Sequence, residues 1–205
     1  MRCTLDCHVK PKIYCESSLI KTDKRIIYAQ PTECRTVVGG AVEDIANDND
    51  GKNIAVFACD LRDSFRLENI AVKYPDCFYE CGIAEQNALT AAAAMAKEGI
   101  TVFYAGFAVF AIGEVYSQLR MADINHAPLK IIATHCGLDV GEDGKTHQCL
   151  DYISLLSNMP NMKILVPADA NHADILTHYA AYNDGAFCIC MGRSKRVCSI
   201  MSGTV

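Results

Sequence analysis

YECGIAEQ, residues 79–86, ends a short apolar run with a glycine and places a carboxylate, Glu85, where an alanine-rich helix is predicted to begin. A carboxylate at this position has two interpretations. The helix dipole and the unpaired N–H groups of a first turn favour acidic side chains, so Glu85 can be a helix-start residue. Alternatively, Glu85 is a chemical group of a functional site, and the rest of the sequence decides between the two.

Composition narrows the class of protein. The chain has 205 residues, 51% apolar and 21% charged, which is enough for one sizeable α/β domain. A net charge of −5 and the absence of a long Lys/Arg run argue against nucleic acid or an anionic membrane as a partner. No apolar stretch approaches the roughly 18 residues of a membrane helix, and the start MRCTLDCHVKPK lacks the apolar centre of a signal peptide. We therefore expect a cytoplasmic protein.

Twelve cysteines are many for this length, and in a secreted protein they would indicate a disulfide framework. Several lie in apolar, strand-like runs, where a cysteine acts as a small hydrophobic residue. The closest groupings lack the CxxC spacing of a metal site: Cys3 with Cys7, Cys77 with Cys81, and Cys188 with Cys190. We interpret the cysteines as reduced thiols and predict no metal site within this chain.

Strand-like and helix-like patterns alternate along the chain. Helices are predicted at residues 35–47, 91–97, 109–123 and 171–182, and strands at residues 54–59, 101–104, 130–134, 163–166 and 186–191. This alternation predicts an α/β fold in which helices cover both faces of a parallel β-sheet. We assign residues 34–205 to one domain and residues 1–33 to an N-terminal arm.

Chemically capable residues follow the predicted strands. In parallel sheets, ligands bind beyond the carboxyl ends of the strands. Five candidates lie at or after such ends: Asp60, Phe107, Phe110, His135 and Arg193. Their convergence on one edge predicts a functional site there.

The order and spacing of several motifs resemble the pyrimidine-binding domain of transketolases. GIAEQ is followed by FYAGFAVF, GEDGKTHQ, PNM, PAD and the Arg193 segment CMGRSKR, and the resemblance covers roughly residues 34–196. Transketolases are thiamine diphosphate enzymes that move two-carbon ketol units between sugars. The resemblance therefore implies the thiamine diphosphate-binding fold and a transferase of the pentose phosphate type.

The resemblance assigns cofactor-binding roles. It implies that Glu85 hydrogen-bonds the aminopyrimidine ring, whose own amino group then removes the reactive proton of the cofactor. Phe107 and Phe110 resemble the aromatic residues that pack on the pyrimidine, although ordinary core aromatics remain the alternative. Asp60 matches an aspartate found near the cofactor.

The substrate-binding roles come from the same resemblance. His135, Asp143 and His147 match residues that line the substrate channel, and His147 is a candidate catalytic residue because histidine exchanges protons near neutral pH. Arg193 matches an arginine that binds the terminal phosphate of a sugar phosphate, with a solvated strand-end arginine as the alternative.

A family motif that is missing points to a partner. Transketolases hold the diphosphate through a divalent metal, Mg²⁺ or Ca²⁺, bound by a GDG motif, and this chain contains no GDG. We therefore expect a diphosphate-binding transketolase subunit to supply that half, in a homodimer or heterotetramer, whether the chain is a natural short subunit or a truncated piece. The alternatives are a deoxyxylulose-phosphate synthase-like subunit, a 2-oxoacid dehydrogenase-like subunit, and a non-catalytic homologue that keeps the fold for association.

Overall fold

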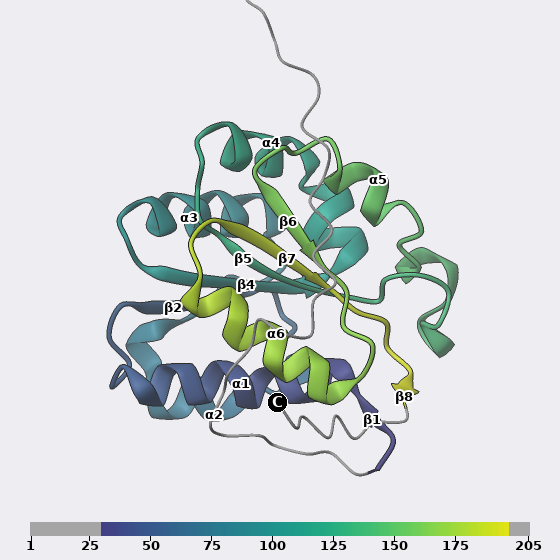
Figure 1. Ribbon diagram of the computed structural model, residues 1–205, viewed down its shortest axis with the longest axis horizontal. Helices are drawn as coiled ribbons and strands as arrows, with labels where there is room; N and C mark the ends of the chain where they lie inside the picture. The colour runs from purple at the N-terminus through teal and green to yellow at the C-terminus, as the bar shows by residue number, and fades with distance from the viewer. Residues whose placement is uncertain (1–29, 197–205) are drawn as a thin grey trace, which may run out of the picture.

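A six-stranded parallel sheet forms the centre of the structure, a computed structural model that describes residues 30–196 (Figure 1). Each neighbouring pair of strands runs parallel. In spatial order the strands are β3 (Phe78–Glu80), β2 (Ile54–Ala58), β4 (Thr101–Phe107), β5 (Lys130–Thr134), β7 (Ala186–Cys190) and β6 (Met162–Leu165). The predicted α/β fold class is confirmed.

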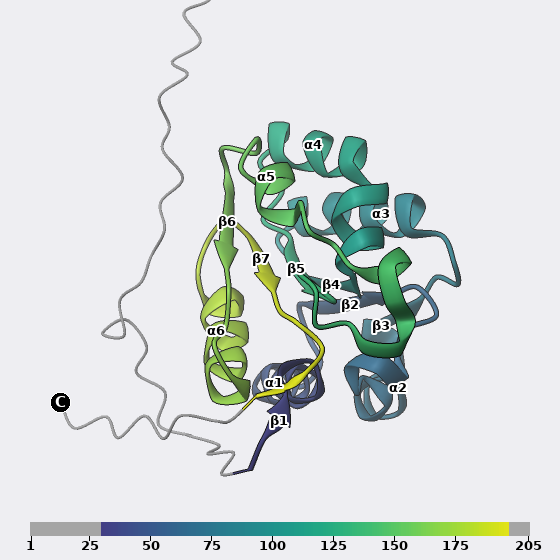
Figure 2. The same cartoon turned by 90° about the vertical axis from the view of Figure 1, so that its right-hand side faces the viewer.

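Helices cover both faces of this sheet, and the two layers are separated clearly in the turned view (Figure 2). One face packs against α1 (Cys34–Asp48), α2 (Glu68–Lys73) and α6 (Ala170–Tyr182). The other packs against α3 (Glu85–Lys97), the π-helix η3 (Val109–Glu114), α4 (Tyr116–Ile124) and α5 (Tyr152–Leu156). Short 3₁₀ segments lie at η1 (Asp63–Phe65), η2 (Pro75–Cys77) and η4 (Gly141–His147). None of the described helices is long and apolar enough to span a bilayer.

The local sequence explains the main elements. Strands β2 and β5 are buried at every position, as expected for parallel strands covered on both faces. Helix α1 buries one stripe at helical spacing, including Val38, Val42 and Ile45. The Asp169 side chain caps α6 by accepting the backbone N–H of His172 at 2.9 Å. These elements agree with the predicted ones to within a few residues.

The predicted helix over residues 109–123 was wrong as a single helix. The segment is a π-helix over Val109–Glu114, followed by a break at Val115 and then by α4. The wider π turn lets Phe110 contact His147 while Ala111 and Ile112 stay buried in the core. A helical hydrophobic period cannot reveal this insertion.

A second, two-stranded sheet joins the two ends of the described chain. Strand β1 (Thr32–Glu33) pairs antiparallel with β8 (Lys195–Arg196). Most of the predicted arm, residues 1–29, lies outside the described residues, so its separation from the domain stays a prediction. Thr32 and Glu33, the last arm positions, pair with a strand of the domain.

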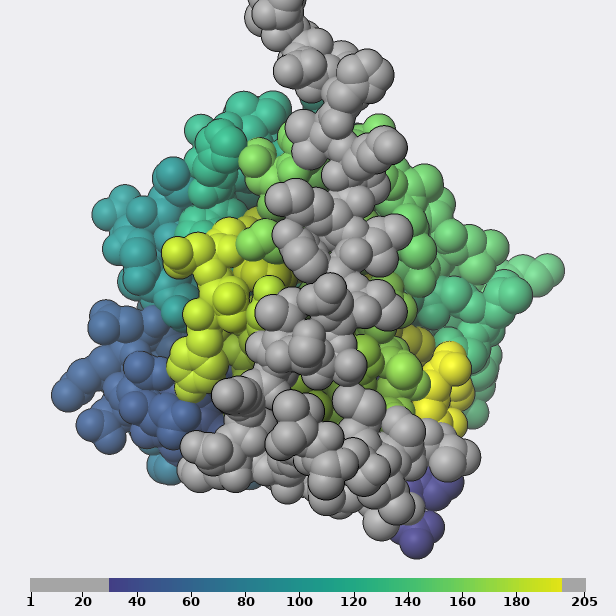
Figure 3. Space-filling view, viewed as in Figure 1, coloured from purple at the N-terminus to yellow at the C-terminus, as the bar shows by residue number. Residues whose placement is uncertain are grey.

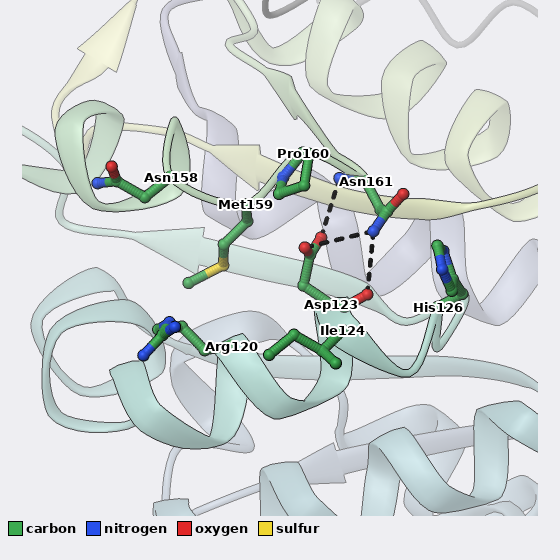
Figure 4. A pocket seen from close by; sticks show the side chains of 8 residues that line it. All are labelled: Arg120, Asp123, Ile124, His126, Asn158, Met159, Pro160 and Asn161. Carbon is green, nitrogen blue, oxygen red and sulfur yellow. Dashed lines mark hydrogen bonds between the residues drawn. The ribbon is translucent and has the colours of Figure 1, made fainter. Parts of the chain in front are cut away.

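The amino edge of the sheet is closed by local pairing. The Asp123 carboxylate in α4 accepts the Asn161 backbone N–H at 3.0 Å, and the Asn161 amide donates to the Asp123 carbonyl at 3.0 Å and to its carboxylate at 3.3 Å (Figure 4). Close by, the buried Lys130 ammonium donates to the carbonyls of Asn183 and Gly185. The PNM motif therefore has a structural role, because Asn161 ties the start of β6 to α4.

Candidate functional site

Glu85 is the first residue of α3, at the carboxyl edge of the sheet, and only 8% of it is exposed. Among the described residues, no hydrogen bond reaches its carboxylate. Behind it lies the fully buried Tyr104, whose hydroxyl also lacks a hydrogen-bond partner. Burial raises the pKa of this hydroxyl and raises that of the neighbouring Cys59 thiol to about 11, and the nearby charge of Glu85 acts in the same direction. Glu85 is thus a buried carboxylate with its acceptor capacity open.

Glu80 organises the loops on either side of this position. Its carboxylate accepts the backbone N–H of Asp60 at 2.7 Å and that of Gly82 at 3.3 Å. Asp60 itself is exposed and adopts a left-handed backbone, φ 55°, a region that aspartate tolerates better than most residues. One carboxylate therefore fixes the turn that carries Asp60 and the turn that leads to Glu85.

Two phenylalanines and two histidines form a cluster at the same edge, at the ends of β4 and β5. The Phe107 ring centroid lies 3.8 Å from that of His135 and 6.3 Å from that of Phe110. His147 makes edge contacts with Phe107 at 5.9 Å and with Phe110 at 5.5 Å. Phe107 and Phe110 therefore form one apolar wall against which both imidazoles rest.

His135 is held in a single orientation inside this cluster. It is fully buried, and its backbone is left-handed at φ 62°, a strained conformation for a histidine. Its Nδ1 lies 2.9 Å from the Thr134 hydroxyl and its Nε2 lies 3.1 Å from Asp143 Oδ2. Burial lowers the pKa of His135 to about 4, despite the opposing bond to Asp143. The ring is therefore neutral near pH 7, and its partners fix Nε2 as the donor to Asp143.

Arg193, just after β7, is tied to the loop that carries Asp143. Its Nη1 donates to the Val140 carbonyl at 2.7 Å and lies 3.0 Å from Asp143 Oδ2, while Nη2 lies 3.3 Å from Glu142 Oε1. In the space-filling view, the green loop and the yellow end of the described chain lie side by side at the margin of the molecule (Figure 3). Arg193 thus already has two carboxylates as partners, and Asp143 is shared between Arg193 and His135.

The loop itself depends on one glycine. Gly144 adopts φ 70° and ψ −160°, a conformation that is open almost only to glycine, and it interrupts η4 between Asp143 and His147. This break separates the two halves of GEDGKTHQ, so that Asp143 contacts His135 while His147 contacts the phenylalanine wall.

Comparison with known proteins shows to which family the chain belongs. Residues 30–196 match the family described as transketolase, pyrimidine binding domain. The chain belongs to this family. A relative from Methanocaldococcus jannaschii, named as a transketolase C-terminal section, is 36% identical over 122 residues, which are 59% of this chain and 39% of the relative. The 1-deoxy-D-xylulose-5-phosphate synthase of Clostridium perfringens is 39% identical over 134 residues, 65% of this chain and 21% of that protein.

A solved structure described as a split gene transketolase, inactive beta4 tetramer, is 31% identical, with a TM-score of 0.72. The similarity covers 86% of this chain and 57% of that chain. The chain therefore spans less than two thirds of the length of each of these three proteins, and what the whole proteins do belongs to the proposal below.

As a pyrimidine-binding domain of the transketolase family, the chain brings most predicted site residues into one contact network. Six are linked by ring contacts, hydrogen bonds or ion pairs: Phe107, Phe110, His135, Asp143, His147 and Arg193. Glu85 and Asp60 lie at the same edge, but within residues 30–196 no such contact joins either of them to the network. The functional roles of all eight stay predictions.

The sequence reasoning missed Arg35, which it treated only as part of a predicted helix. In the structure its guanidinium pairs with Glu33 at 2.7 Å and, like Arg193, its charge acts to lower the pKa of His135. A second cation therefore lies near His135. The signal that could have found it is position: α1 runs towards the start of β2, so its first turn lies at the carboxyl edge.

The residues present fit the pyrimidine half of thiamine diphosphate. A buried carboxylate without a hydrogen-bond partner suits a ring nitrogen, and the Phe107–Phe110 wall suits a flat aromatic ring. Within the described part of the chain, no group of three or more His, Cys, Asp or Glu side chains is arranged to hold a metal ion.

Proposed function

We propose that this chain is the pyrimidine-binding part of a thiamine diphosphate-dependent transketolase, which transfers a two-carbon ketol unit between sugar phosphates. The observation that carries the proposal is the buried, unpartnered carboxylate of Glu85, at the sheet edge that also carries the phenylalanine wall and the two histidines. The family membership and the similarity to a split gene transketolase support it.

In this proposal, the Glu85 carboxyl group would hydrogen-bond the pyrimidine ring nitrogen and hold a proton there. Phe107 and Phe110 exclude water from one side of the ring. Bound thiamine diphosphate supplies the carbanion chemistry, so the protein contributes positioning and proton control.

The two histidines receive different tasks. His135 is neutral, and its Nε2 is held by Asp143. It can hydrogen-bond a substrate carbonyl or hydroxyl only if the substrate replaces Asp143 as the partner of Nε2. His147 is half-buried, and its Nδ1 lies 2.9 Å from the Thr146 hydroxyl, which leaves Nε2 to face a substrate. We therefore assign proton exchange with the substrate to His147 and positioning to His135.

Arg193 is proposed to bind the phosphate of the substrate, with Arg35 as a second cation near the same histidine. The exposed Glu142 carboxylate now occupies one side of the Arg193 guanidinium. A phosphate would have to displace Glu142, which is exposed and is held by this bond at 3.3 Å.

A second candidate function is that of 1-deoxy-D-xylulose-5-phosphate synthase, favoured by the 39% identity to the clostridial enzymes. Both candidates use the same cofactor and both involve a sugar phosphate. An assay that offers a ketose phosphate donor in one arm and a 2-oxo acid donor in the other separates them, because only the first supports ketol transfer between sugars.

The diphosphate and its Mg²⁺ or Ca²⁺ are proposed to be held by a partner subunit, in a homodimer or heterotetramer. The sequence supplies no GDG motif, and three of the most exposed apolar side chains lie close in sequence to site residues: Ile83, Leu138 and Leu150. A cytoplasmic location is part of the proposal, supported by the free state of all eight cysteines in residues 30–196.

Calorimetric titration with thiamine diphosphate and Mg²⁺ tests the split site. We expect little heat from the chain alone, because it lacks the residues that hold the charged diphosphate, and binding once a diphosphate-binding transketolase subunit is added. Glu85→Ala should weaken binding in the mixture, whereas Asn158→Ala, at the opposite edge, should not. Micromolar binding by the chain alone would defeat the split-site proposal.

A further inference from the structure

Two cysteines face each other across neighbouring strands beside Glu85. Strands β2 and β3 pair in parallel with Ala58 opposite Glu80, so the next residues, Cys59 and Cys81, stand opposite each other. The ladder continues to this point, since the Cys81 backbone N–H donates to the Ala58 carbonyl at 2.9 Å. Neighbouring strands lie about 4.8 Å apart, within the roughly 4.4–6.8 Å between Cα atoms that a disulfide requires.

Both side chains point to the same face of the sheet. Two residues earlier on each strand, the rings of Phe57 and Tyr79 stack with centroids 4.7 Å apart, and side chains two apart on a strand share a face. Cys59 belongs to the hydrophobic core on that face and Cys81 packs against it. Burial is the main cause that raises the pKa of the Cys59 thiol, and the charge of a Cys81 thiolate acts in the same direction.

The two thiols differ in access. Cys59 is 3% exposed, whereas Cys81 is partly exposed at the end of β3. A small reagent therefore meets Cys81 first, and Cys59 is positioned to react second. This division is the arrangement of an attacking and a resolving cysteine.

We propose that Cys59 and Cys81 form a reversible disulfide in response to low-molecular-weight disulfides. The Cys81 thiolate attacks one sulfur of the reagent, forms a mixed disulfide and releases the first small thiol. The Cys59 thiolate then attacks the Cys81 sulfur and releases the second. Two protein thiols are oxidised, one reagent disulfide is reduced to two thiols, and both protons leave with them.

The bond would act on the turn before Glu85. The backbone N–H of Ala84 donates to the Gly82 carbonyl at 2.9 Å and also acts to lower the pKa of the Cys59 thiol, and Ala84 immediately precedes Glu85. Joining Cys59 to Cys81 would tie the end of β2 to the residue that follows β3, three residues before Ala84. The consequence for the cofactor rests on the proposed function of Glu85, whereas the disulfide itself does not.

The experiment uses the full chain with Cys3, Cys7, Cys15 and Cys198 replaced by serine. The chain is incubated with oxidised glutathione, and the products are mapped by mass spectrometry of a non-reduced digest. We expect a Cys59–Cys81 crosslink that dithiothreitol removes. In Cys59→Ser, Cys81 should instead keep a stable glutathione adduct, and in Cys81→Ser, Cys59 should stay reduced.

The chain contains its own control pair. Cys136 and Cys149 also stand opposite each other in a parallel bridge, but they are only 7% and 2% exposed, so neither thiol is open to a reagent as Cys81 is. This pair should stay reduced under the same conditions. A persistent Cys81 adduct in the parent chain, or oxidation of Cys136 with Cys149 before Cys59 with Cys81, would overturn the proposal.

A second readout separates the disulfide from the function of Glu85. In the mixture with the diphosphate-binding subunit, oxidation should weaken cofactor binding at least tenfold, reduction should restore it, and Cys81→Ser should abolish the effect. A crosslink that leaves cofactor binding unchanged would refute the link to Glu85, while the mapped disulfide would still stand.

Discussion

The two edges of the sheet differ in whether their buried polar groups have hydrogen-bond partners. At the amino edge, Asp123 and Asn161 satisfy each other through three hydrogen bonds, and the Lys130 ammonium binds two carbonyls and lies 4.7 Å from the centre of the Phe187 ring. At the carboxyl edge, the buried Tyr104 hydroxyl lacks a hydrogen-bond partner among residues 30–196, and no hydrogen bond there reaches the carboxylate of Glu85, a residue that is 8% exposed.

The difference shows that, within the described residues, the carboxyl edge carries groups that destabilise the folded state, whereas the amino edge does not. A buried polar group without a partner destabilises a protein by about 1–3 kcal/mol, and the strained backbone of His135 adds to that at the same edge. At the amino edge, the buried polar groups of Asp123 and Lys130 are stabilised by hydrogen bonds within the chain. The unpartnered groups of Glu85 and Tyr104 lie together and support the assignment of a site there, whereas a further unpartnered atom, Asp174 Oδ1, lies within α6.

The largest expected effect tests the carboxyl edge directly. In the assembled complex, Glu85→Gln should reduce turnover by about a hundredfold to ten-thousandfold, because an amide cannot share a proton with a ring nitrogen as a carboxyl group does. The measurement is steady-state kinetics where chemistry limits the rate. Activity within a few-fold of the parent would return Glu85 to a helix-start role.

The matched variant at the amino edge is Asp123→Asn. It should lower the free energy of unfolding by about 1–3 kcal/mol, because two donors then face an amide in place of a carboxylate. Turnover per folded molecule should stay unchanged. A comparable loss of turnover would mean that the two edges do not differ in the way proposed.

The pH dependence of stability should report His135. The pKa of His135 in the folded chain, about 4, lies below its ordinary value of 6.5. Between about pH 4 and pH 6.5, His135 is therefore protonated in the unfolded chain but not in the folded chain. Stability attributed to this residue is complete above about pH 6.5 and falls by about 3 kcal/mol as the pH drops to about 4.

Urea unfolding across this pH range, in the parent and in His135→Asn, isolates the contribution. Asparagine tolerates the left-handed backbone and does not titrate, so the variant should show a shallower loss. His172→Gln serves as a control, because burial also lowers the pKa of His172. This variant should change the dependence of unfolding free energy on pH independently of His135→Asn. Equal slopes in the parent and His135→Asn would contradict the buried, neutral state of His135.

A smaller effect is expected at Arg193. Arg193→Ala should weaken the preference for phosphorylated over unphosphorylated sugars about tenfold, since a charge-assisted bond to phosphate contributes roughly 1.5–3 kcal/mol. Arg196→Ala, which removes a neighbouring cation that pairs with Asp139, should leave the preference intact. If Arg193→Ala impairs both substrates equally, the arginine serves only to hold the loop.

The smallest expected effect is a gain. Tyr104→Phe removes a buried hydroxyl that has no hydrogen-bond partner, so the free energy of unfolding should rise by about 1 kcal/mol. Denaturant unfolding of the chain alone is the measurement. Destabilisation by a similar amount would show that the Tyr104 hydroxyl has a hydrogen-bond partner in solution and would contradict the contrast between the two edges.

Much of this architecture was readable from the sequence, for identifiable reasons. Strand β5 was predicted with its observed bounds because its centre, residues 131–133, is apolar, and Glu85 was placed at the start of a helix by the glycine before it and the alanines after it. Residues at strand ends converge because parallel strands end at one edge. That rule places five candidates there, and the family resemblance supplies their roles: Asp60, Phe107, Phe110, His135 and Arg193.

What the sequence could not show depends on tertiary contacts. The π-helix over Val109–Glu114 adds a residue to a turn without changing the hydrophobic pattern. The ion pairs of Arg193 with Glu142 and Asp143 join segments about fifty residues apart, and no local pattern specifies them. Arg35 was missed because a helix start near a site looks like any other helix start.

The pairing of β1 with β8 has a topological consequence. It brings Thr32 beside Arg196, so the two ends of the described segment, residues 30–196, adjoin each other. A domain with adjoining ends can be spliced into a longer polypeptide, or cut free from one, without rearranging its core. A circularly permuted chain, joined across this pair and opened at the exposed turn of residues 49–53, would keep the sheet order intact.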